Sequence, residues 1–376
     1  VQRFLAQLGR LGVAPTRGGI PGSQLSDNAF GILRLDLNLN DAHTVSLRGD
    51  VRSNAQDATR IGVLAVPTFG GDARSTGGGV MLTLTSRLDR EVLGGTVINE
   101  AKVYGSAERR DAAPYVSVPA GRVRVTSDVG EGVTGVSTLS FGGNPSLFDD
   151  DRTDYVEATE ELSWQSPNGG HRVKLGGLLN ASRYDQWTTF NPYGTYTYNS
   201  LQDFIEGRPA LFTRALQART NAGGAVNAAG YLGDTWRLDR RFQLTYGVRL
   251  EATTYSGAPR LNAAVQERFG LRTDRFPTEV RASPRVGFTY TFFPDTARQN
   301  ARLDSAGRAR RAQQQQQGLF RGGPTLFVRG GVGEFRGRAP SSLFSAAQQG
   351  SGLPGDETQL VCAGSGIPLP NYAAYT

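Results

Sequence analysis

The sequence is poor in cysteine, lysine, histidine and long apolar runs, and each scarcity argues against a class of protein. Cys362 is the only cysteine among 376 residues, so no disulfide framework closes within the chain. No apolar run approaches the roughly 20 residues of a membrane-spanning helix, so any passage across a membrane must use strands. The two histidines, His43 and His171, have no nucleophile in a recognisable arrangement beside them. We therefore predict no enzyme and no cofactor.

Lysine occurs only at Lys102 and Lys174, so arginine supplies nearly all of the 41 basic residues and of the net charge of +7. The arginines are dispersed along the chain and do not gather with aromatic residues into one patch, which argues against nucleic-acid binding. Clustered carboxylates at Asp149, Asp150 and Asp151, with Asp154, either bind a hard cation such as calcium or are simply solvated, and they lack EF-hand spacing. We predict no metal site.

The 49 glycines and 18 prolines argue against a helical protein, and period-two alternation of apolar and polar residues predicts strands instead. Leu33, Leu35 and Leu37 alternate with Arg34 and Asp36, for example. Ten such strands are expected near residues 30–40, 44–53, 79–88, 95–108, 153–165, 171–184, 226–238, 241–256, 283–293 and 324–337. One face is too charged for the inside of a soluble protein. The fold class is therefore all-β, a transmembrane antiparallel barrel segment with an apolar outside and a wet inside.

The connections between these strands are alternately short and long. Short ones lie near residues 41–43, 89–90, 166–170 and 239–240, and long ones at 54–78, 109–152, 185–225 and 257–282. This asymmetry is typical of short periplasmic turns and long extracellular loops. Residues 294–323 break the rule, and their arginines and glutamines predict a flexible, low-complexity periplasmic insertion. The chain is thus read as one partial barrel, 1–376, with extracellular loops at 1–29 and 338–376 around the strands of 30–337.

Strand parity and loop position predict three sets of site residues. The membrane girdle comprises Trp164, Trp236, Phe242, Phe292 and Phe293. The lumen-facing basic set, which either pairs with acidic plug residues or lines a route for an anionic substrate, comprises Arg34, Arg48, Arg52, Arg172, Lys174, Arg249, Arg285 and Arg329. Aromatics of the long third loop, which either bind an external ligand or pack within the loop, are Trp187, Phe190, Tyr193, Tyr196, Tyr198, Phe204 and Phe212. The parity that points Trp164 outward also points Glu160 outward.

Several segments, in their order along the chain, resemble the barrel of Oar-like TonB-dependent receptors. The most specific are residues 230–238 (GYLGDTWRL) and 244–251 (LTYGVRLE), followed by 283–290 (SPRVGFTY) and 328–333 (VRGGVG). Residues 98–100 (INE), 141–144 (FGGN), 155–164 (YVEATEELSW) and 204–209 (FIEGRP) fit as well. The resemblance runs through nearly the whole chain.

This resemblance implies an outer-membrane barrel of 22 strands, closed by an internal plug, that imports a bound substrate when the TonB system pulls on the plug. About ten strands and no recognisable plug or TonB box are present, so we expect a segment of a larger receptor. Its expected partners are outer-membrane lipid, the remaining barrel strands and, through the absent plug, the TonB system. The alternative is a structural or adhesive surface protein that uses the barrel as an anchor without energised transport.

Overall fold

The computed structural model describes residues 1–14, 24–92, 94–128, 130–217, 219–276, 278–292, 310, 326–337, 347–348, 350–353 and 359–375. Phe293 and, apart from residue 310, the whole predicted insertion at 294–323 lie outside the described residues. None of the described helices is both long and apolar enough to cross a membrane.

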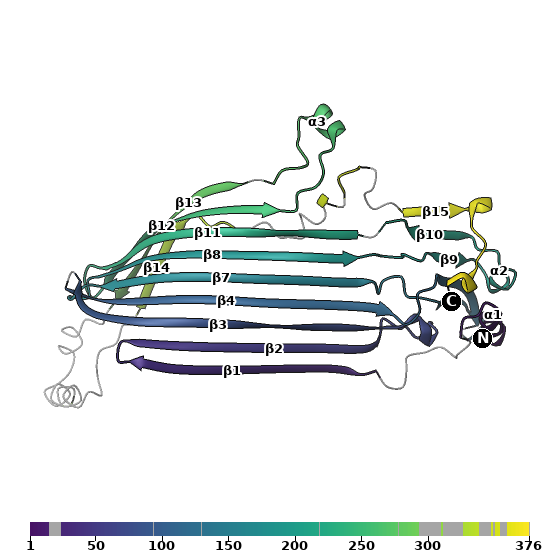
Figure 1. Ribbon diagram of the computed structural model, residues 1–376, viewed down its shortest axis with the longest axis horizontal. Coiled ribbons are helices and arrows are strands. Elements are labelled where there is room, and N and C mark those ends of the chain that lie inside the picture. The colour runs from purple at the N-terminus through teal and green to yellow at the C-terminus, as the bar shows by residue number, and fades with distance from the viewer. Residues whose placement is uncertain are drawn as a thin grey trace.

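Ten long strands form one antiparallel sheet in which each strand pairs with the next in chain order, apart from short elements between them (Figure 1). They are β1 (Ser26–Asn40), β2 (His43–Thr59), β3 (Gly71–Val92), β4 (Gly95–Pro114), β7 (Asp149–Gln165), β8 (His171–Thr188), β11 (Arg219–Arg237), β12 (Phe242–Ser256), β13 (Glu279–Phe292) and β14 (Leu326–Gly333). All ten predicted strands are present, and several are longer than expected. Within the described residues the sheet stays open, with β1 and β14 at its two edges.

Side chains alternate between the two faces of this sheet, and the register keeps apolar and polar sets apart. Leu35 lies opposite Leu47, which in turn lies opposite Leu82, and these residues belong to what we call the apolar face. Arg34 lies opposite Arg48 on the polar face. The leucines that β1 contributes to the apolar face are 55–63% exposed. The apolar face continues across neighbouring strands, and soluble monomers rarely expose such a continuous apolar surface. This face therefore requires apolar surroundings.

The short turns all lie at one end of the sheet and the long connections at the other (Figure 1). Side-chain acceptors hold the short turns. The carboxylate of Asp239 accepts hydrogen bonds from the backbone N–H groups of Arg241 (2.6 Å) and Phe242 (2.8 Å), which lowers the pKa of this carboxyl. Strand β3 continues through Val92, past the turn expected near 89–90, and β4 begins at Gly95.

The long connections fold into a second sheet that the alternation pattern did not predict. Its five strands, in the order β15-β10-β9-β5-β6, are β5 (Ala120–Asp128), β6 (Thr134–Phe141), β9 (Thr195–Tyr198), β10 (Leu211–Ala215) and β15 (Gln359–Ala363). The helices α1 (Gln2–Arg10) and α2 (Leu201–Ile205), with the short helices η1 (Pro67–Phe69) and η3 (Tyr372–Tyr375), contribute side chains to its core. We call this unit the cap. Two further helices, α3 (Ala263–Phe269) and η2 (Gly364–Gly366), lie outside this core.

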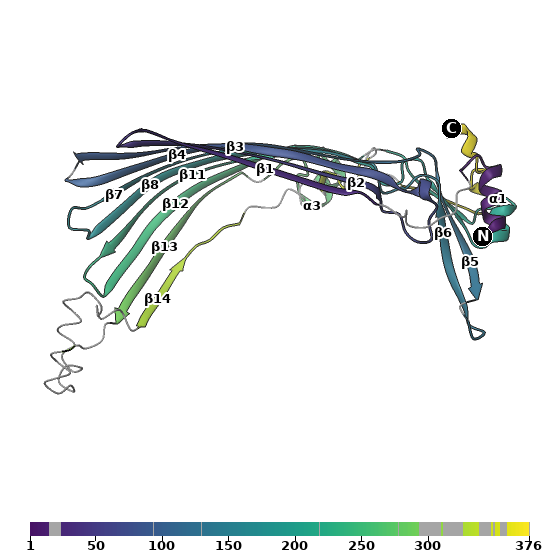
Figure 2. The ribbon, with the colours of Figure 1, turned by 90° about the horizontal axis from the view of Figure 1, so that it is seen from below.

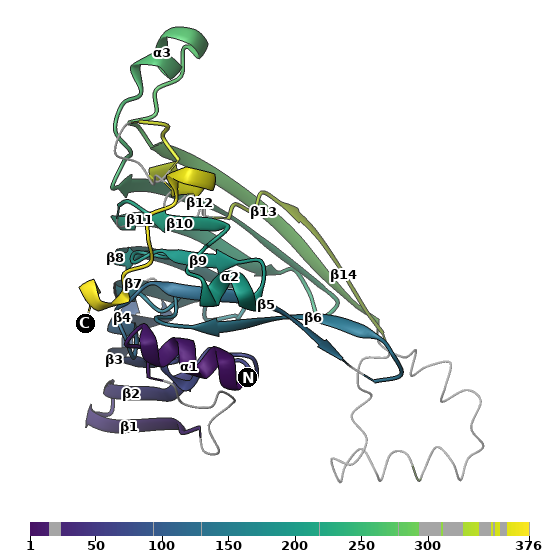
Figure 3. The ribbon, with the colours of Figure 1, turned by 90° about the vertical axis from the view of Figure 1, so that its right-hand side faces the viewer.

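The cap sits at the long-connection end of the large sheet (Figure 1). The large sheet is curved, and the β5–β6 hairpin projects from the cap toward the concave side of that curve (Figures 2 and 3). The predicted loop at 1–29 contains α1 and the start of β1, and the predicted loop at 109–152 contains β5 and β6. Both segments thus have more regular structure than expected.

Candidate functional site

The register places all eight residues of the predicted basic set on the polar face. Arg172 and Lys174 of β8 lie opposite Thr235 and Gly233 of β11, and Arg249 of β12 lies opposite Tyr231. Parity alone accounts for this agreement, because β7, β8, β11 and β12 pair over their central parts without a register shift.

A chain of polar contacts crosses the polar face from β7 to β11. Lys174 Nζ lies 2.5 Å from Glu161 Oε1, and the Tyr231 hydroxyl donates to Glu161 Oε2 at 2.6 Å. Strand β12 carries a second pair, in which Arg249 Nε lies 3.3 Å from Glu251 Oε2. These side chains are 20–38% exposed, so the contacts orient the charges more than they stabilise the fold. The sequence reading missed Glu161 and Glu251, although both share the parity of residues it selected.

A groove of about 900 Å³ lies on the polar face between β8 and β14. Its charged lining includes Arg172, Lys174, Arg249 and Arg285, and Phe335 closes one side, with the Arg285 guanidinium 4.5 Å from its ring centre. Four cations around one water-accessible groove make a region that attracts anions or carboxylates.

The positive charge of the polar face is only partly compensated by the described residues. Arg34 is paired with Asp36 (2.9 Å) and Arg52 with Glu108 (2.7 Å). Arg48, however, lies opposite Arg34 of β1 on one side and opposite Met81 of β3 on the other. Two like charges directly opposite each other are unfavourable. The excess positive charge of this face is stabilised when an acidic partner or solvent faces it. Arg329 lies farther along, with its guanidinium 5.8 Å from the ring centre of Phe327.

Four of the five predicted girdle residues lie on the apolar face at the short-turn end. Trp164 lies opposite Val97 and Val173, and Trp236 lies opposite Leu244. The remaining two, Phe242 and Phe292, pair with apolar neighbours at the same end. Glu160 shares this face, as expected from its parity, and accepts a hydrogen bond from the Asn99 amide.

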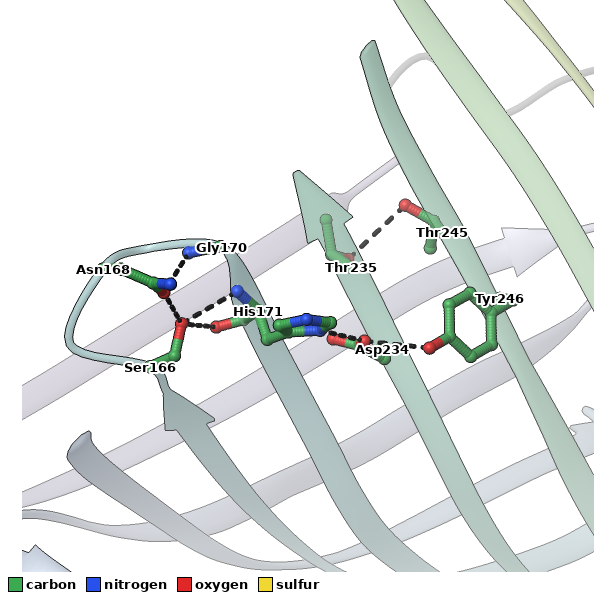
Figure 4. A network of polar contacts seen from close by, with 8 residues as sticks. All are labelled: Ser166, Asn168, Gly170, His171, Asp234, Thr235, Thr245 and Tyr246. Carbon is green, nitrogen blue, oxygen red and sulfur yellow. Dashed lines mark hydrogen bonds and ion pairs between the residues drawn. The ribbon is translucent and has the colours of Figure 1, made fainter. Parts of the chain in front are cut away.

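A polar network occupies the apolar face beside the girdle (Figure 4). His171 Nδ1 lies 2.7 Å from Asp234 Oδ2, the Tyr246 hydroxyl donates to the same oxygen at 3.0 Å, and Trp236 stacks on the imidazole. The Ser166 hydroxyl contacts the main chain of His171, whose N–H it accepts at 2.9 Å, and does not reach the imidazole. His171 and Tyr246 thus satisfy only Oδ2 of Asp234, while its Oδ1 is buried without a hydrogen-bond partner among the described residues. The group has no geometry for nucleophilic catalysis.

The aromatics proposed as a ligand-binding set are divided between the core of the cap and its surface. Tyr196, Tyr198 and Phe204 are at most 5% exposed and form the core with Phe4 and other residues. Burial raises the pKa of the Tyr198 hydroxyl. Phe212 is buried in the same core, so for these four residues packing explains the aromatic character.

The other three aromatics of that set stay nearer to the surface. Trp187 is 37% and Phe190 44% exposed, while Tyr193 packs on Phe148 with ring centres 5.5 Å apart. Only Trp187 and Phe190 therefore remain open to an external ligand.

The clustered aspartates begin strand β7 and face arginines. Asp150 pairs with Arg109 at 2.9 Å, and Asp154 pairs with Arg152 at 3.1 Å. Among the described residues there is no group of three or more histidine, cysteine, aspartate and glutamate side chains that could hold a metal ion.

Among the comparisons with known proteins, the match to a family model agrees with this architecture. The family model for an outer membrane beta barrel domain matches residues 14–301, more than half of the chain. The outer membrane transporter YddB from Escherichia coli is 13% identical, with a TM-score of 0.43 over 71% of this chain and 30% of that chain. The ferripyoverdine receptor of Pseudomonas aeruginosa is 11% identical, with a TM-score of 0.43 over 71% and 33%.

The ferric yersiniabactin uptake receptor FyuA from Yersinia pestis is 12% identical, with a TM-score of 0.41 over 72% of this chain and 36% of that chain. The chain thus spans about a third of the length of these structures. No curated protein matches it. The family match confirms the predicted fold class of a barrel segment and the predicted location, and the chain belongs to the outer membrane beta barrel domain family.

Proposed function

We propose that this chain is part of the barrel of a TonB-dependent receptor that binds a substrate at the cell surface and imports it. The long connections and the cap lie outside the cell in this proposal, and the short turns lie in the periplasm. The asymmetry between short and long connections favours this orientation.

The observation that carries the proposal is the polar face with its excess of basic side chains. The groove lined by Arg172, Lys174, Arg249 and Arg285 is wide, and its cations exceed the acids that pair with them. A water-filled structural barrel gains nothing from concentrating cations on one wall. A barrel that encloses an acidic plug does benefit from these cations, because ion pairs with acidic plug residues hold the plug in place. Screening by water and salt keeps these pairs weak enough for the plug to move.

Photo-crosslinking in the full-length protein tests this assignment. A benzophenone side chain replaces Tyr231, which lies among the basic residues of the groove. We expect a crosslink within the same polypeptide to a segment rich in aspartate and glutamate, located by mass spectrometry. The matched position is Leu175, on the neighbouring strand β8 and on the apolar face, which does not line the groove and where the crosslink should go to lipid. Crosslinking only to lipid or solvent at both positions contradicts an enclosed plug.

Import is tested separately by comparing the solutes that cells remove from their medium. A receptor of this kind predicts at least one solute whose depletion requires both this protein and the TonB system. If depletion is unchanged in both deletion strains, the protein does not import.

A surface anchor without transport is the second candidate, and the cap favours it. Loops that only gate a pore have no need of a core, whereas this cap buries Leu8, Val123, Phe141 and Phe204 completely. The crosslink at Tyr231 and the solute comparison together separate the two candidates, because an anchor predicts neither result.

A further inference from the structure

The outer edge of strand β6 is only partly occupied. The backbone N–H of Ser140 donates to Leu64 O (2.9 Å), and Ser140 O accepts from the N–H of Val66 (2.9 Å). These bonds add the segment around Ala65 to the edge as a single parallel bridge. They also show that the backbone groups of Ser140 point away from β5.

Alternation along the strand then fixes the direction of the remaining groups. The register between β5 and β6 is regular from residue 141 to residue 134, so Thr138, Val136 and Thr134 direct their N–H and C=O groups to the same side as Ser140. Among the described residues, none of these groups has a hydrogen-bond partner. Three alternate positions of a folded strand therefore remain available for pairing.

The edge also lacks the features that proteins use to prevent such pairing. Strand β6 has the sequence TGVSTLSF, without a charged residue, proline or register shift. Val136 is 69% exposed and Val63, near the occupied end of the edge, is also 69% exposed. An uncharged, partly apolar and preformed edge is a template for an added strand.

The charges beside the edge indicate what kind of strand fits. Arg122 and Arg124 of β5 lie opposite Ser140 and Thr138, so their side chains are on the same face as those of Thr138 and Val136. Both are exposed, and neither forms an ion pair or hydrogen bond with a described residue. A second copy of the β5–β6 hairpin would bring its own two β5 arginines to this face, which argues against self-pairing. Acidic side chains on an added strand would be attracted.

We propose that the free edge of β6 captures an extended, acidic segment of a partner polypeptide by β-strand addition. The hairpin projects toward the concave side of the large sheet, so the captured segment is held over the end of the barrel (Figure 3). The proposal takes the orientation of the cap from the proposed function, but it does not depend on import.

The test measures peptide binding to the purified full-length protein in detergent. The probe is a fluorescein-labelled heptapeptide, Thr-Glu-Val-Glu-Val-Glu-Thr, and the charge control replaces each Glu by Lys. We expect saturable binding of the acidic peptide and binding about tenfold weaker or less for the basic one. Arg122→Gln combined with Arg124→Gln should weaken the acidic peptide about fivefold.

Backbone pairing is tested by two N-methylated peptides, one methylated at every Glu amide and the other at every Val amide. Successive amides of a strand point to opposite sides, so one peptide should lose binding and the other should keep it. In the protein, Val136→Pro removes an outward N–H that β5 does not use and should weaken binding about tenfold or more. Val136→Thr keeps the N–H and should bind normally.

Hydrogen exchange gives a readout that needs no variant. The amides of Val136 and Thr138 should exchange rapidly in the free protein and slow when the acidic peptide is added. Slow exchange without peptide would show that another part of the protein covers the edge, and it would overturn the proposal. Equal binding by both methylated peptides, or by Val136→Pro and the parent protein, would overturn it as well. All of these results are independent of solute uptake, so they leave the import proposal to its own test.

Discussion

Arginine substitutions at three positions of β8 measure directly which face of the sheet contacts lipid. Leu175 and Leu179 lie on the apolar face, opposite Leu162 and Ala158 of β7, whereas Leu178 lies on the polar face, opposite Thr159. Strands rise about 3.3 Å per residue and tilt by about 40° in such barrels. Leu175 is four residues beyond His171 at the girdle, so it lies about 10 Å into the membrane, and Leu179 lies about 20 Å in.

The apolar band of such barrels is about 25 Å tall, so Leu175 is near its centre and Leu179 approaches the outer rim. We expect Leu175→Arg to lower the free energy of unfolding by about 2–4 kcal/mol and Leu179→Arg by about 1–2 kcal/mol, because the cost of a charge falls toward the interface. Leu178→Arg should cost less than about 0.5 kcal/mol, since its side chain reaches water.

The assay is denaturant unfolding of the full-length protein in phospholipid vesicles, followed by tryptophan fluorescence. The order of the three costs matters more than their absolute size, because all three variants carry the same new side chain on one strand. A cost for Leu178→Arg equal to or greater than that for Leu175→Arg would refute the assignment of the faces.

Three further predictions concern the cap and the polar face. Phe204→Ala removes a fully buried ring and should destabilise the cap by about 3–5 kcal/mol; proteolysis of intact cells should then cleave the cap while the barrel still shows heat-modifiable migration. Glu161→Gln should change the free energy of unfolding by less than about 1 kcal/mol in urea titrations, because its contacts with Lys174 and Tyr231 are partly exposed. A loss of several kcal/mol would show that they are shielded from water. Burial raises the pKa of the Tyr372 hydroxyl well above its ordinary value of 10.0, so its contribution to stability is complete below pH 10 and falls as the pH rises further. Tyr372→Phe should therefore flatten the alkaline loss of cap stability measured by circular dichroism, and an unchanged pH profile would contradict this account.

The large sheet could be predicted from the sequence because its signal is local. A strand with lipid on one side and water on the other alternates at every residue, and Leu33, Leu35 and Leu37 show this without any knowledge of their neighbours. The same parity correctly separated Arg34 and Arg48 from the leucines. Its limits are the strand ends, because outside the lipid the alternation has no physical cause: β3 continues past the expected turn to Val92, and β4 continues to Pro114, beyond its expected end at 108.

The cap could not be predicted in this way because its core is assembled from distant segments. Phe4, Phe141, Phe204 and Tyr372 come from four parts of the chain and meet only after folding. Its strands are short, and the four residues of β9 are too few for a period to be read. The aromatic residues of the third loop were a real signal, but aromatics that fill a core and aromatics that bind a ligand have the same composition.

The two sheets therefore have different roles, and these follow from the solvent that each sheet faces. The large sheet needs no protein to cover its apolar face because lipid covers it. Its residues therefore indicate position in the membrane and say little about a ligand. The cap stands in water and must bury its own core, and it does so with most of the aromatics of the third loop. Under the two proposals above, recognition at this end falls to what the core leaves outside, namely Trp187, Phe190 and the free part of the β6 edge beside Arg122 and Arg124 of β5. In the proposed receptor, substitutions at that edge change the partner without disturbing either the barrel or the core.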